Sequence, residues 1–413
     1  MKMKSFYTSL LLALVINSTL YSQEFNSNKL IADIEYLSSD QLKGRFAGTK
    51  GEKAAAQYIA KRFKDLKLTS LSNNYLQNFS FKQPNNPHDE LEFDKRGKNQ
   101  INSINVSGYL NNNKENTIII GAHFDHIGYG GIYSLDTDRM EKNKIHNGAD
   151  DNASGVALLL NLAERLIKEN NSNNNYLFIA FSAEELGLIG SKYFVENPLI
   201  DLKNANYMIN LDMVGRLNKD KELSVFGAGT SPVFKQVINS TNNNFSLKII
   251  DDGIGPSDHT SFYNKGIPVL FFNSGSHQDY HKSSDDFELI NFSGIREISE
   301  YVINIIHELN NFGKLNFRET VSEQPTVSRF KVSLRVMPDY VYEKEGMRAD
   351  QIIKGGPADK AGLIDGDVII KVGEYYIKDI YAYMNALSNF KDGDEIILVI
   401  LRNGKEIEFK VKF

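Results

Sequence analysis

Short runs of consecutive apolar residues alternate with longer amphipathic segments through the first three quarters of the chain. In one such segment, Ser154–Lys168, the apolar positions recur at helical spacing and predict an amphipathic helix. Lys53–Lys67 and Ile295–Leu309 show the same spacing and predict two more helices. Four apolar runs have the length and composition of buried strands. They are Thr117–Gly121, Tyr176–Phe181, Tyr207–Leu211 and Pro268–Phe272.

This alternation of strands and helices predicts an α/β fold, a three-layer sandwich with a mostly parallel central sheet. Ligands of such sheets bind beyond the carboxyl ends of the strands. We therefore expect the chemically active side chains at the ends of the predicted strands.

The pattern changes near the C-terminus, where short strands and Gly turns dominate from about residue 328 onward. The preceding stretch is polar and weakly patterned, which is typical of a linker. We predict a large α/β domain over residues 23–310, a linker over 311–327 and a small β-rich domain over 328–413.

The N-terminus has a basic start and an apolar stretch from Phe6 to Ile16, followed by the small residue Ser22. This order predicts a signal peptide over residues 1–22 and export to the periplasm or the medium. A frayed apolar terminus is the alternative. The stretch is short for a bilayer, and no other segment is long and apolar enough, so we expect no membrane span.

Charge and cysteine content narrow the choice of chemistry. The 413 residues carry 47 Lys and Arg against 52 Asp and Glu, a net charge of −5. With no basic run, the sequence argues against nucleic acid as a partner. Cysteine is absent, which excludes disulfides, thiolate metal sites and a thiol nucleophile. Any metal must therefore be held by His, Asp and Glu.

The first predicted strand leads into His123-Phe124-Asp125. Residues i and i+2 of a strand point the same way. Asp125 could thus accept the second ring N–H of a metal-binding His123, although a polar strand end is the alternative. Asp151 precedes the amphipathic helix, where it could be a metal ligand or a helix cap.

Acids also follow the second and third strands. Glu184 and Glu185 could complement a helix dipole, or could divide metal binding and proton transfer between them. Asp212 lies in an apolar strand, where an acid is costly unless it is paired or binds a cation. Tyr280 and His281 follow a polar loop; the His could be structural, and the Tyr could be packed or could donate its hydroxyl.

Together, two His and three acids suit two Zn²⁺ ions per chain, which need a bridging carboxylate and a bridging water. The order of the segments resembles the di-zinc aminopeptidases of metallopeptidase family 28 over about residues 24–310, most strongly from Asn105 to Asp286. The resemblance implies one zinc held by His123, Asp151 and Asp212, and a second held by Asp151, Glu185 and His281.

The same resemblance implies further roles: Glu184 as general base, Asp125 as the partner of His123, and Tyr280 as an oxyanion donor. Pro256–His259 and Phe262 match a family segment expected to line or support the site. The predicted protein is an exported zinc aminopeptidase acting on peptides with a free N-terminus. A carboxypeptidase or glutaminyl cyclase on the same scaffold stays open, as does a non-catalytic binding protein. The preferred N-terminal residue, the oligomeric state and the role of 128–146 are not predicted.

The C-terminal region resembles a PDZ domain of bacterial exported proteases in Gly356-Pro357-Ala358, Ala361-Gly362-Leu363 and Gly366–Ile369. The resemblance implies a groove helix at Tyr381–Ser388, and closing strands at Ile396–Leu401 and Ile407–Val411. PDZ domains add a chain end to their sheet as a strand. Where the family prefers Gly in the carboxylate-binding loop, this chain reads Val332-Ser333-Leu334-Arg335-Val336. The domain could bind a peptide or an intramolecular ligand, or only pack on the larger domain.

Overall fold

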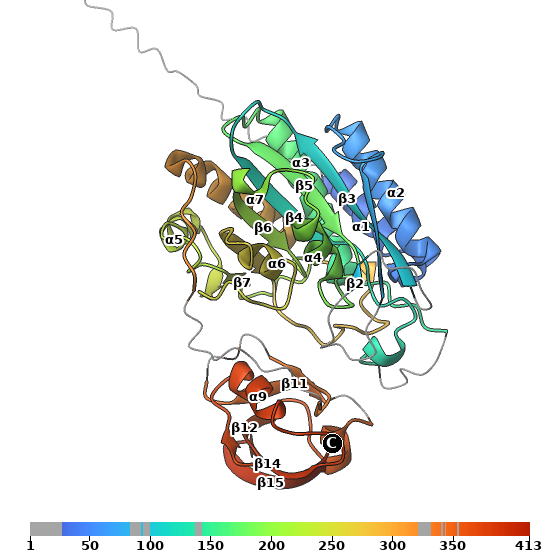
Figure 1. Cartoon of the computed structure of the whole chain (residues 1–413), viewed down its shortest axis with the longest axis vertical. Coiled ribbons are helices and arrows are strands. Elements are labelled where there is room, and N and C mark those ends of the chain that lie inside the picture. The colour runs from blue at the N-terminus through green and yellow to red at the C-terminus, as the bar shows by residue number, and fades with distance from the viewer. Residues whose placement is uncertain are drawn as a thin grey trace, which may run out of the picture.

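The computed structural model describes residues 27–82, 92–93, 100–136, 143–320, 332–339, 342, 344–352 and 355–413. The predicted signal peptide lies outside these residues. The chain forms a larger domain, with helices on both faces of a sheet, and a smaller β-rich domain at the C-terminus (Figure 1). No helix in the described part of the chain has the length and apolar character needed to cross a bilayer.

The larger sheet has nine strands in the order β2-β1-β3-β5-β4-β6-β9-β7-β8. The four central strands β5, β4, β6 and β9 are parallel, whereas β1, β2 and β3 pair antiparallel at one side. The prediction of an α/β fold with a largely parallel central sheet is confirmed. The strands are β1 Leu76–Lys82, β2 Glu92–Phe93, β3 Gln100–Leu110, β4 Thr117–His123, β5 Asn175–Phe181, β6 Ala205–Leu211, β7 Glu222–Phe226, β8 Ser246–Ile249 and β9 Val269–Asn273.

Helices cover both faces of this sheet. Helices α1, α2, α3, α5 and α7 contribute to one core cluster, and α4 and α6 pack on the opposite face. The three helices predicted from the sequence correspond to α2, α3 and α7. The helices are α1 Ser27–Leu37, α2 Lys50–Asp65, α3 Gly155–Lys168, α4 Ile189–Glu196, α5 Phe234–Thr241, α6 His259–Tyr263 and α7 Phe292–Leu309.

Strand β4 shows why the predicted strands read as continuous apolar runs. Ile118 and Ile120 belong to the cluster under α3, whereas Ile119 belongs to the opposite cluster with Phe194 and Phe262. Successive side chains of a strand point to opposite faces. Because both faces are covered, every position must be apolar. The strand carries polar side chains only at its two ends, at Thr117 and at His123.

The smaller sheet has the order β10-β11-β12-β14-β15, with β13 pairing to β12, and all its pairs are antiparallel. It encloses a core cluster of its own. The predicted groove helix and closing strands correspond to α9, β14 and β15. The elements are β10 Val336–Pro338, β11 Met347–Ile352, α8 Pro357–Ala361, β12 Val368–Val372, β13 Tyr375–Tyr376, α9 Ile380–Leu387, β14 Glu395–Arg402 and β15 Lys405–Lys412.

Residues 311–320, the first part of the predicted linker, run along the larger domain. The Leu315 N–H donates to Asn206 Oδ1 at 2.8 Å, and the Arg318 N–H donates to the carbonyl of Thr230 at 2.8 Å. The Thr320 N–H donates to the hydroxyl of Tyr263 at 3.0 Å. Polar side chains and backbone groups thus fix this segment, which explains its lack of an apolar period. Residues 321–331 lie outside the described residues.

Candidate metal centre

Three neighbouring parallel strands bring the candidate residues together. Strand β4 ends at His123, β5 is followed by Glu184 and Glu185, and β6 is followed by Asp212. Because carboxyl ends of parallel strands meet at one edge of a sheet, these side chains share one region. Asp151 joins them from the loop that precedes α3.

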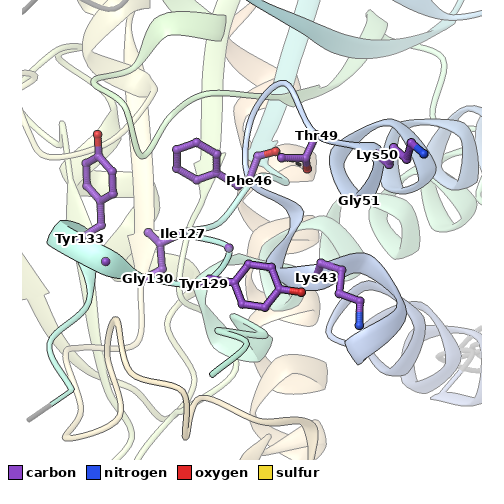
Figure 2. A pocket seen from close by; sticks show the side chains of 11 residues that line it. Lys43, Phe46, Thr49, Lys50, Gly51, Ile127, Tyr129, Gly130 and Tyr133 are labelled. Carbon is purple, nitrogen blue, oxygen red and sulfur yellow. Dashed lines mark hydrogen bonds between the residues drawn. The ribbon is translucent and has the colours of Figure 1, made fainter. Parts of the chain in front are cut away.

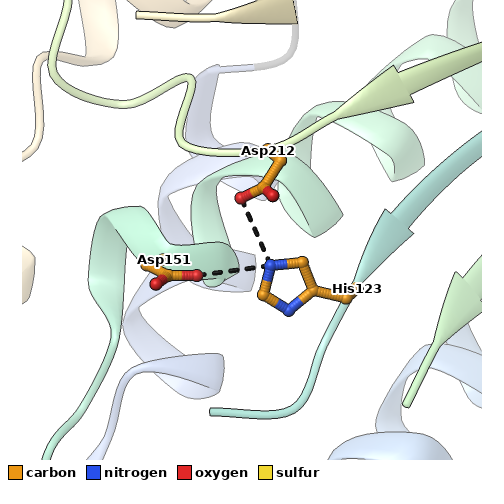
Figure 3. A group of neighbouring side chains, drawn as sticks. All are labelled: His123, Asp151 and Asp212. Carbon is orange, nitrogen blue, oxygen red and sulfur yellow. Dashed lines mark hydrogen bonds and ion pairs between the residues drawn. The ribbon is translucent and has the colours of Figure 1, made fainter. Parts of the chain in front are cut away.

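The first group consists of His123, Asp151 and Asp212 (Figure 3). The His123 Nε2 atom lies 3.3 Å from Asp151 Oδ1 and 3.2 Å from Asp212 Oδ1. All three side chains are buried. One imidazole and two carboxylates converging in this way could hold a cation.

A second group shares Asp151 with the first. His281 Nε2 lies 3.2 Å from Asp151 Oδ2 and 3.0 Å from Glu185 Oε2, yet it is buried without a hydrogen-bond partner. The two oxygens of Asp151 therefore face different imidazoles. Burial alone would raise the pKa of Asp151, but the neighbouring imidazoles of His123 and His281 outweigh burial and hold this pKa well below its usual value.

His126 is a third imidazole at this site, and our sequence analysis missed it. Its Nδ1 lies 2.7 Å from Glu185 Oε1 and 3.9 Å from Asp151 Oδ2, so His126, Asp151 and Glu185 also form a possible cation site. The His126 and His281 rings meet edge to face at 5.6 Å between centroids. The only signal in the sequence was its position directly after Asp125.

Asp125 contacts the segments that carry His123, Glu184 and Glu185. Its carboxylate accepts the backbone N–H groups of Glu184, at 3.0 Å, and Glu185, at 3.4 Å. Its Oδ1 lies 3.7 Å from His123 Nδ1, while its own carbonyl oxygen is closer, at 3.3 Å. The closer contact to His123 thus comes from the Asp125 backbone carbonyl, whereas the carboxylate bonds to the start of the Glu184–Glu185 turn.

The segment Pro256–His259 supports Asp212. The Ser257 hydroxyl donates to Asp212 Oδ2 at 2.7 Å and accepts a hydrogen bond from the Asn210 amide at 2.7 Å. Pro256 lines the metal-site cavity, and Phe262 packs in the core behind it. The expectation that this segment lines or supports the site agrees with these contacts.

Glu184 and Tyr280 line the same cavity, which has a volume of about 90 Å³. Glu184 Oε2 lies 4.0 Å from His123 Nε2. Burial, with smaller effects from Asp258 and Asp212, raises the pKa of Glu184 well above its usual value. The Tyr280 ring stacks on His281 with centroids 4.1 Å apart, and burial raises the pKa of its hydroxyl. Pro338 and Asp339 of the smaller domain also line this cavity.

A buried arginine connects the loops that carry the site. Arg45, 1% exposed, donates to the carbonyls of Phe124 at 2.7 Å, Asn147 at 2.6 Å and Gly148 at 3.0 Å, and also to that of Leu37. Burial lowers its pKa to about 10, although site carboxylates such as Asp151 favour the charged form. Arg45 therefore fixes the turn after β4 against the loop that carries Asp151.

The segment 128–146, whose role the sequence left open, supports His281 in its described part. The carbonyl of Tyr133 lies 3.2 Å from His281 Nδ1, and the Leu135 N–H donates to the carbonyl of His281 at 2.9 Å. This segment also walls a separate cavity of about 660 Å³. Figure 2 shows the aromatic rings of Phe46, Tyr129 and Tyr133 around it, and its lining includes none of the acids of the metal site.

Comparison with known proteins agrees with this geometry. Residues 105–306 match the profile of Peptidase family M28, and residues 333–413 match that of the PDZ domain. The chain therefore contains a peptidase family M28 domain followed by a PDZ domain, and the resemblance noted in the sequence is confirmed.

Individual relatives are aminopeptidases. A probable leucine aminopeptidase of Arthroderma otae is 25% identical over 225 residues, which are 51% of this chain and 58% of the relative. Aminopeptidase YwaD of Bacillus subtilis is 32% identical over 174 residues, 39% of this chain and 37% of the relative. The chain thus matches little more than half of the first relative's length and about a third of the second's.

Solved structures share the fold. A zinc aminopeptidase from Bacillus subtilis aligns with a TM-score of 0.55 at 21% identity, covering 69% of this chain and 96% of that one. The glutaminyl cyclase of Porphyromonas gingivalis aligns with a TM-score of 0.55 at 19% identity, covering 69% and 99%. Structural likeness at identities this low establishes a shared fold only. The reaction must be argued from the residues of the site.

Proposed function

We propose that this chain is a zinc-dependent aminopeptidase that removes N-terminal residues from peptides. The observation that carries the proposal is the position of Asp151, whose two carboxylate oxygens face His123 and His281 separately. A shared carboxylate is what two zinc ions roughly 3.5–4 Å apart require. The aminopeptidase relatives support the same reaction.

The side chains at the site fit zinc. They offer only imidazole nitrogens and carboxylate oxygens, both of which zinc accepts. His123, Asp151 and Asp212 would hold one ion. Asp151, Glu185 and His281 would hold the other. His281 Nε2 is buried beside two carboxylates without a hydrogen bond, as expected of a nitrogen that binds a cation.

His126 is a second imidazole beside Asp151 and Glu185. Its Nδ1 already contacts Glu185 Oε1 at 2.7 Å. In our proposal this contact orients Glu185, as partners of ligating carboxylates do, and His281 is the ligating imidazole. Replacement of His126 should then weaken zinc binding less than replacement of His281 does.

Two bound zinc ions would polarise the scissile carbonyl and lower the pKa of a water molecule to about 7. Glu184 acts as the general base: its carboxylate takes a proton from the attacking water and passes it to the nitrogen of the leaving amine. The Tyr280 hydroxyl donates a hydrogen bond to the oxyanion that forms on the carbonyl.

The direct test is Glu184→Gln assayed on leucine p-nitroanilide after zinc loading. General acid–base catalysis contributes about 10²–10⁴-fold, so we expect a loss of that size with about two zinc ions still bound. Glu196→Gln, at an exposed position of α4, is the matched control and should retain full activity. Undiminished hydrolysis by Glu184→Gln would refute the proposed mechanism.

We also propose that the protein is exported after removal of residues 1–22. The basic start, the apolar stretch and Ser22 support this. N-terminal sequencing of the protein from the periplasm and the medium should give a chain that begins at Gln23. A mature protein that retains Met1 in the cytoplasm would contradict export.

A further inference from the structure

The PDZ domain contributes to the wall of the metal-site cavity. Pro338 and Asp339, at the end of β10, line it together with His123, Glu184 and Asp212. Asp339 is held in place from the PDZ side, because its N–H donates to the carbonyl of Arg348 at 2.9 Å and its Oδ2 accepts from the Arg348 guanidinium at 3.0 Å. The end of β10 is therefore fixed within the PDZ domain, and it forms part of the cavity wall.

Strand β10 has a free edge. It is the end strand of its sheet, and within the described residues it pairs with β11 alone. The backbone groups on the other side of an end strand can pair with an added chain. PDZ domains bind extended peptides by this kind of strand addition.

The direction of β10 relates this edge to the cavity. The strand begins after Arg335 and runs toward Pro338 and Asp339 in the cavity wall. A peptide added antiparallel would place its N-terminal end at the cavity and its C-terminal end beside Arg335. A parallel peptide would present its C-terminus to the cavity instead.

Charge favours the antiparallel direction. The Arg335 side chain is exposed at the start of β10, in the loop that precedes the strand. Its backbone has φ 54°, and its N–H donates to the Ser333 hydroxyl at 3.0 Å, which fixes the turn. A guanidinium matches a carboxylate through charge-assisted hydrogen bonds. The C-terminal carboxylate of a peptide therefore fits at Arg335.

We propose that one peptide substrate occupies both domains: it pairs with β10, its C-terminal carboxylate binds Arg335, and its N-terminus enters the metal-site cavity. Five residues, Arg335 to Asp339, cover about 13 Å at ~3.3 Å per residue. With one or two more residues inside the cavity, the preferred substrate is a free-ended peptide of about six residues. This inference rests on the proposed aminopeptidase function and gives that function a substrate class.

The test is a series of peptides with N-terminal Leu, two to twelve residues long, each made as free acid and as C-terminal amide. For the full-length zinc-loaded protein, we expect kcat/KM to peak near six residues. At that length, the amide should have a KM about tenfold higher than the acid, with kcat unchanged. Leucine p-nitroanilide reports the metal site alone and should not respond to changes at Arg335.

Two charge-reversal variants provide the comparison. Arg335→Glu should abolish the preference for the free acid while leaving p-nitroanilide turnover unchanged. Lys405→Glu makes the same charge change at an exposed position on β15, at the far side of the sheet, and should keep the preference. Equal KM values for acid and amide in the unmodified protein, with p-nitroanilide turnover intact, would overturn the inference.

Binding separates this inference from the proposed function. Calorimetric titration of Glu184→Gln with the six-residue peptide should give an affinity about tenfold higher for the free acid than for the amide or for an N-acetylated peptide. If the protein fails to hydrolyse leucine p-nitroanilide but still binds the free acid more tightly than the amide, only the catalytic proposal is contradicted. Release of C-terminal residues, seen by mass spectrometry, would show that the peptide binds in the opposite direction and would overturn the inference.

Discussion

The two carboxylate oxygens of Asp151 face different imidazoles. The other candidate metal ligands are each contacted by a further polar group of the protein. For Asp212 that group is Ser257, whose hydroxyl donates to Oδ2 at 2.7 Å. Ser257→Ala should lower zinc affinity about 10–100-fold, the usual cost of losing a group that orients a ligand. Competition with a zinc chelator measures this affinity.

Ser261→Ala is the matched control for that measurement. Ser261 is also buried, and its hydroxyl bonds to that of Ser191 at 2.8 Å, away from Asp212. Its loss should affect stability but leave zinc affinity unchanged. Equal affinities in the Ser257→Ala variant and the unmodified protein would show that Asp212 does not depend on this hydroxyl.

Arg45 gives a second prediction about a single residue. Arg45→Met removes the donors from the carbonyls of Phe124, Asn147 and Gly148 in a buried position. Since hydrogen bonds to charged groups contribute roughly 1.5–3 kcal/mol each, we expect the free energy of unfolding to fall by at least about 3 kcal/mol. Arg165→Met, which breaks bonds to Ser299, to Glu169 and to the half-exposed Glu300 but to no loop of the site, should cost less in the same urea titration.

The elements of the fold follow from the sequence wherever one physical signal dominates. Strands β4, β5, β6 and β9 were predictable because both of their faces are covered and most of their positions are apolar. Strand β3 was not predicted, because its polar residues, among them Ser103 and Asn105, are buried through hydrogen bonds to side chains far along the chain. The local sequence pattern does not show which distant side chains bond to these polar residues.

The residues of the candidate site also divide into those that the sequence indicated and those that it did not. The resemblance to metallopeptidase family 28 predicted the set His123, Asp151, Glu185, Asp212 and His281. Local pattern alone would not have given it, because Asp151 precedes a helix, where acids also act as caps, and His281 follows a polar loop. His126 was missed since it follows the motif rather than ending a strand. Arg45 was missed because its partners are carbonyl groups of Phe124, Asn147 and Gly148, which look the same in every sequence.

Helix α2 connects to the site through a buried acid and gives a pH prediction. Glu52 accepts hydrogen bonds from the Ser182 hydroxyl at 2.6 Å and from the Ser103 hydroxyl, and burial raises its pKa to about 7. The unfolded value is near 4.5. The folded protein thus binds the extra proton between these values, so this group's contribution to stability falls as pH rises from about 4.5 to about 7.

The change attributable to Glu52 is on the order of 3 kcal/mol. Urea unfolding of Glu52→Gln at pH 5 and pH 8, with chelator present, should show a smaller loss of stability at high pH than the unmodified protein shows. Glu35→Gln, at an exposed position of α1, should leave the pH dependence as it is. A Glu52→Gln variant that loses as much stability between the two pH values would contradict the burial effect.

At the scale of the whole molecule, two separate cores support one cavity. The core of the PDZ domain shares no residue with the cluster under the metal site. Zinc should therefore stabilise the larger domain, by about 2.7 kcal/mol at a free concentration of 100 Kd. Calorimetry should give two transitions, of which only the larger domain's shifts on adding chelator.

A single transition that shifts as a whole on adding chelator would instead mean that the two domains unfold together. Peptide hydrolysis and the preferred peptide length would then both depend on one cooperative folding unit made of the two domains. Pro338 and Asp339 of the PDZ domain line the metal-site cavity. The number of transitions therefore also tests whether β10 and the larger domain are held together tightly enough to unfold as one.

The central claim is that Asp151 joins two cations within one cage, and anomalous diffraction at the zinc edge from a zinc-loaded crystal tests it most directly. The account predicts two peaks roughly 3.5–4 Å apart, one beside His123 and Asp212, the other beside Glu185 and His281, with an oxygen of Asp151 at each. A single peak, or two peaks that leave Asp151 uncoordinated, would contradict it.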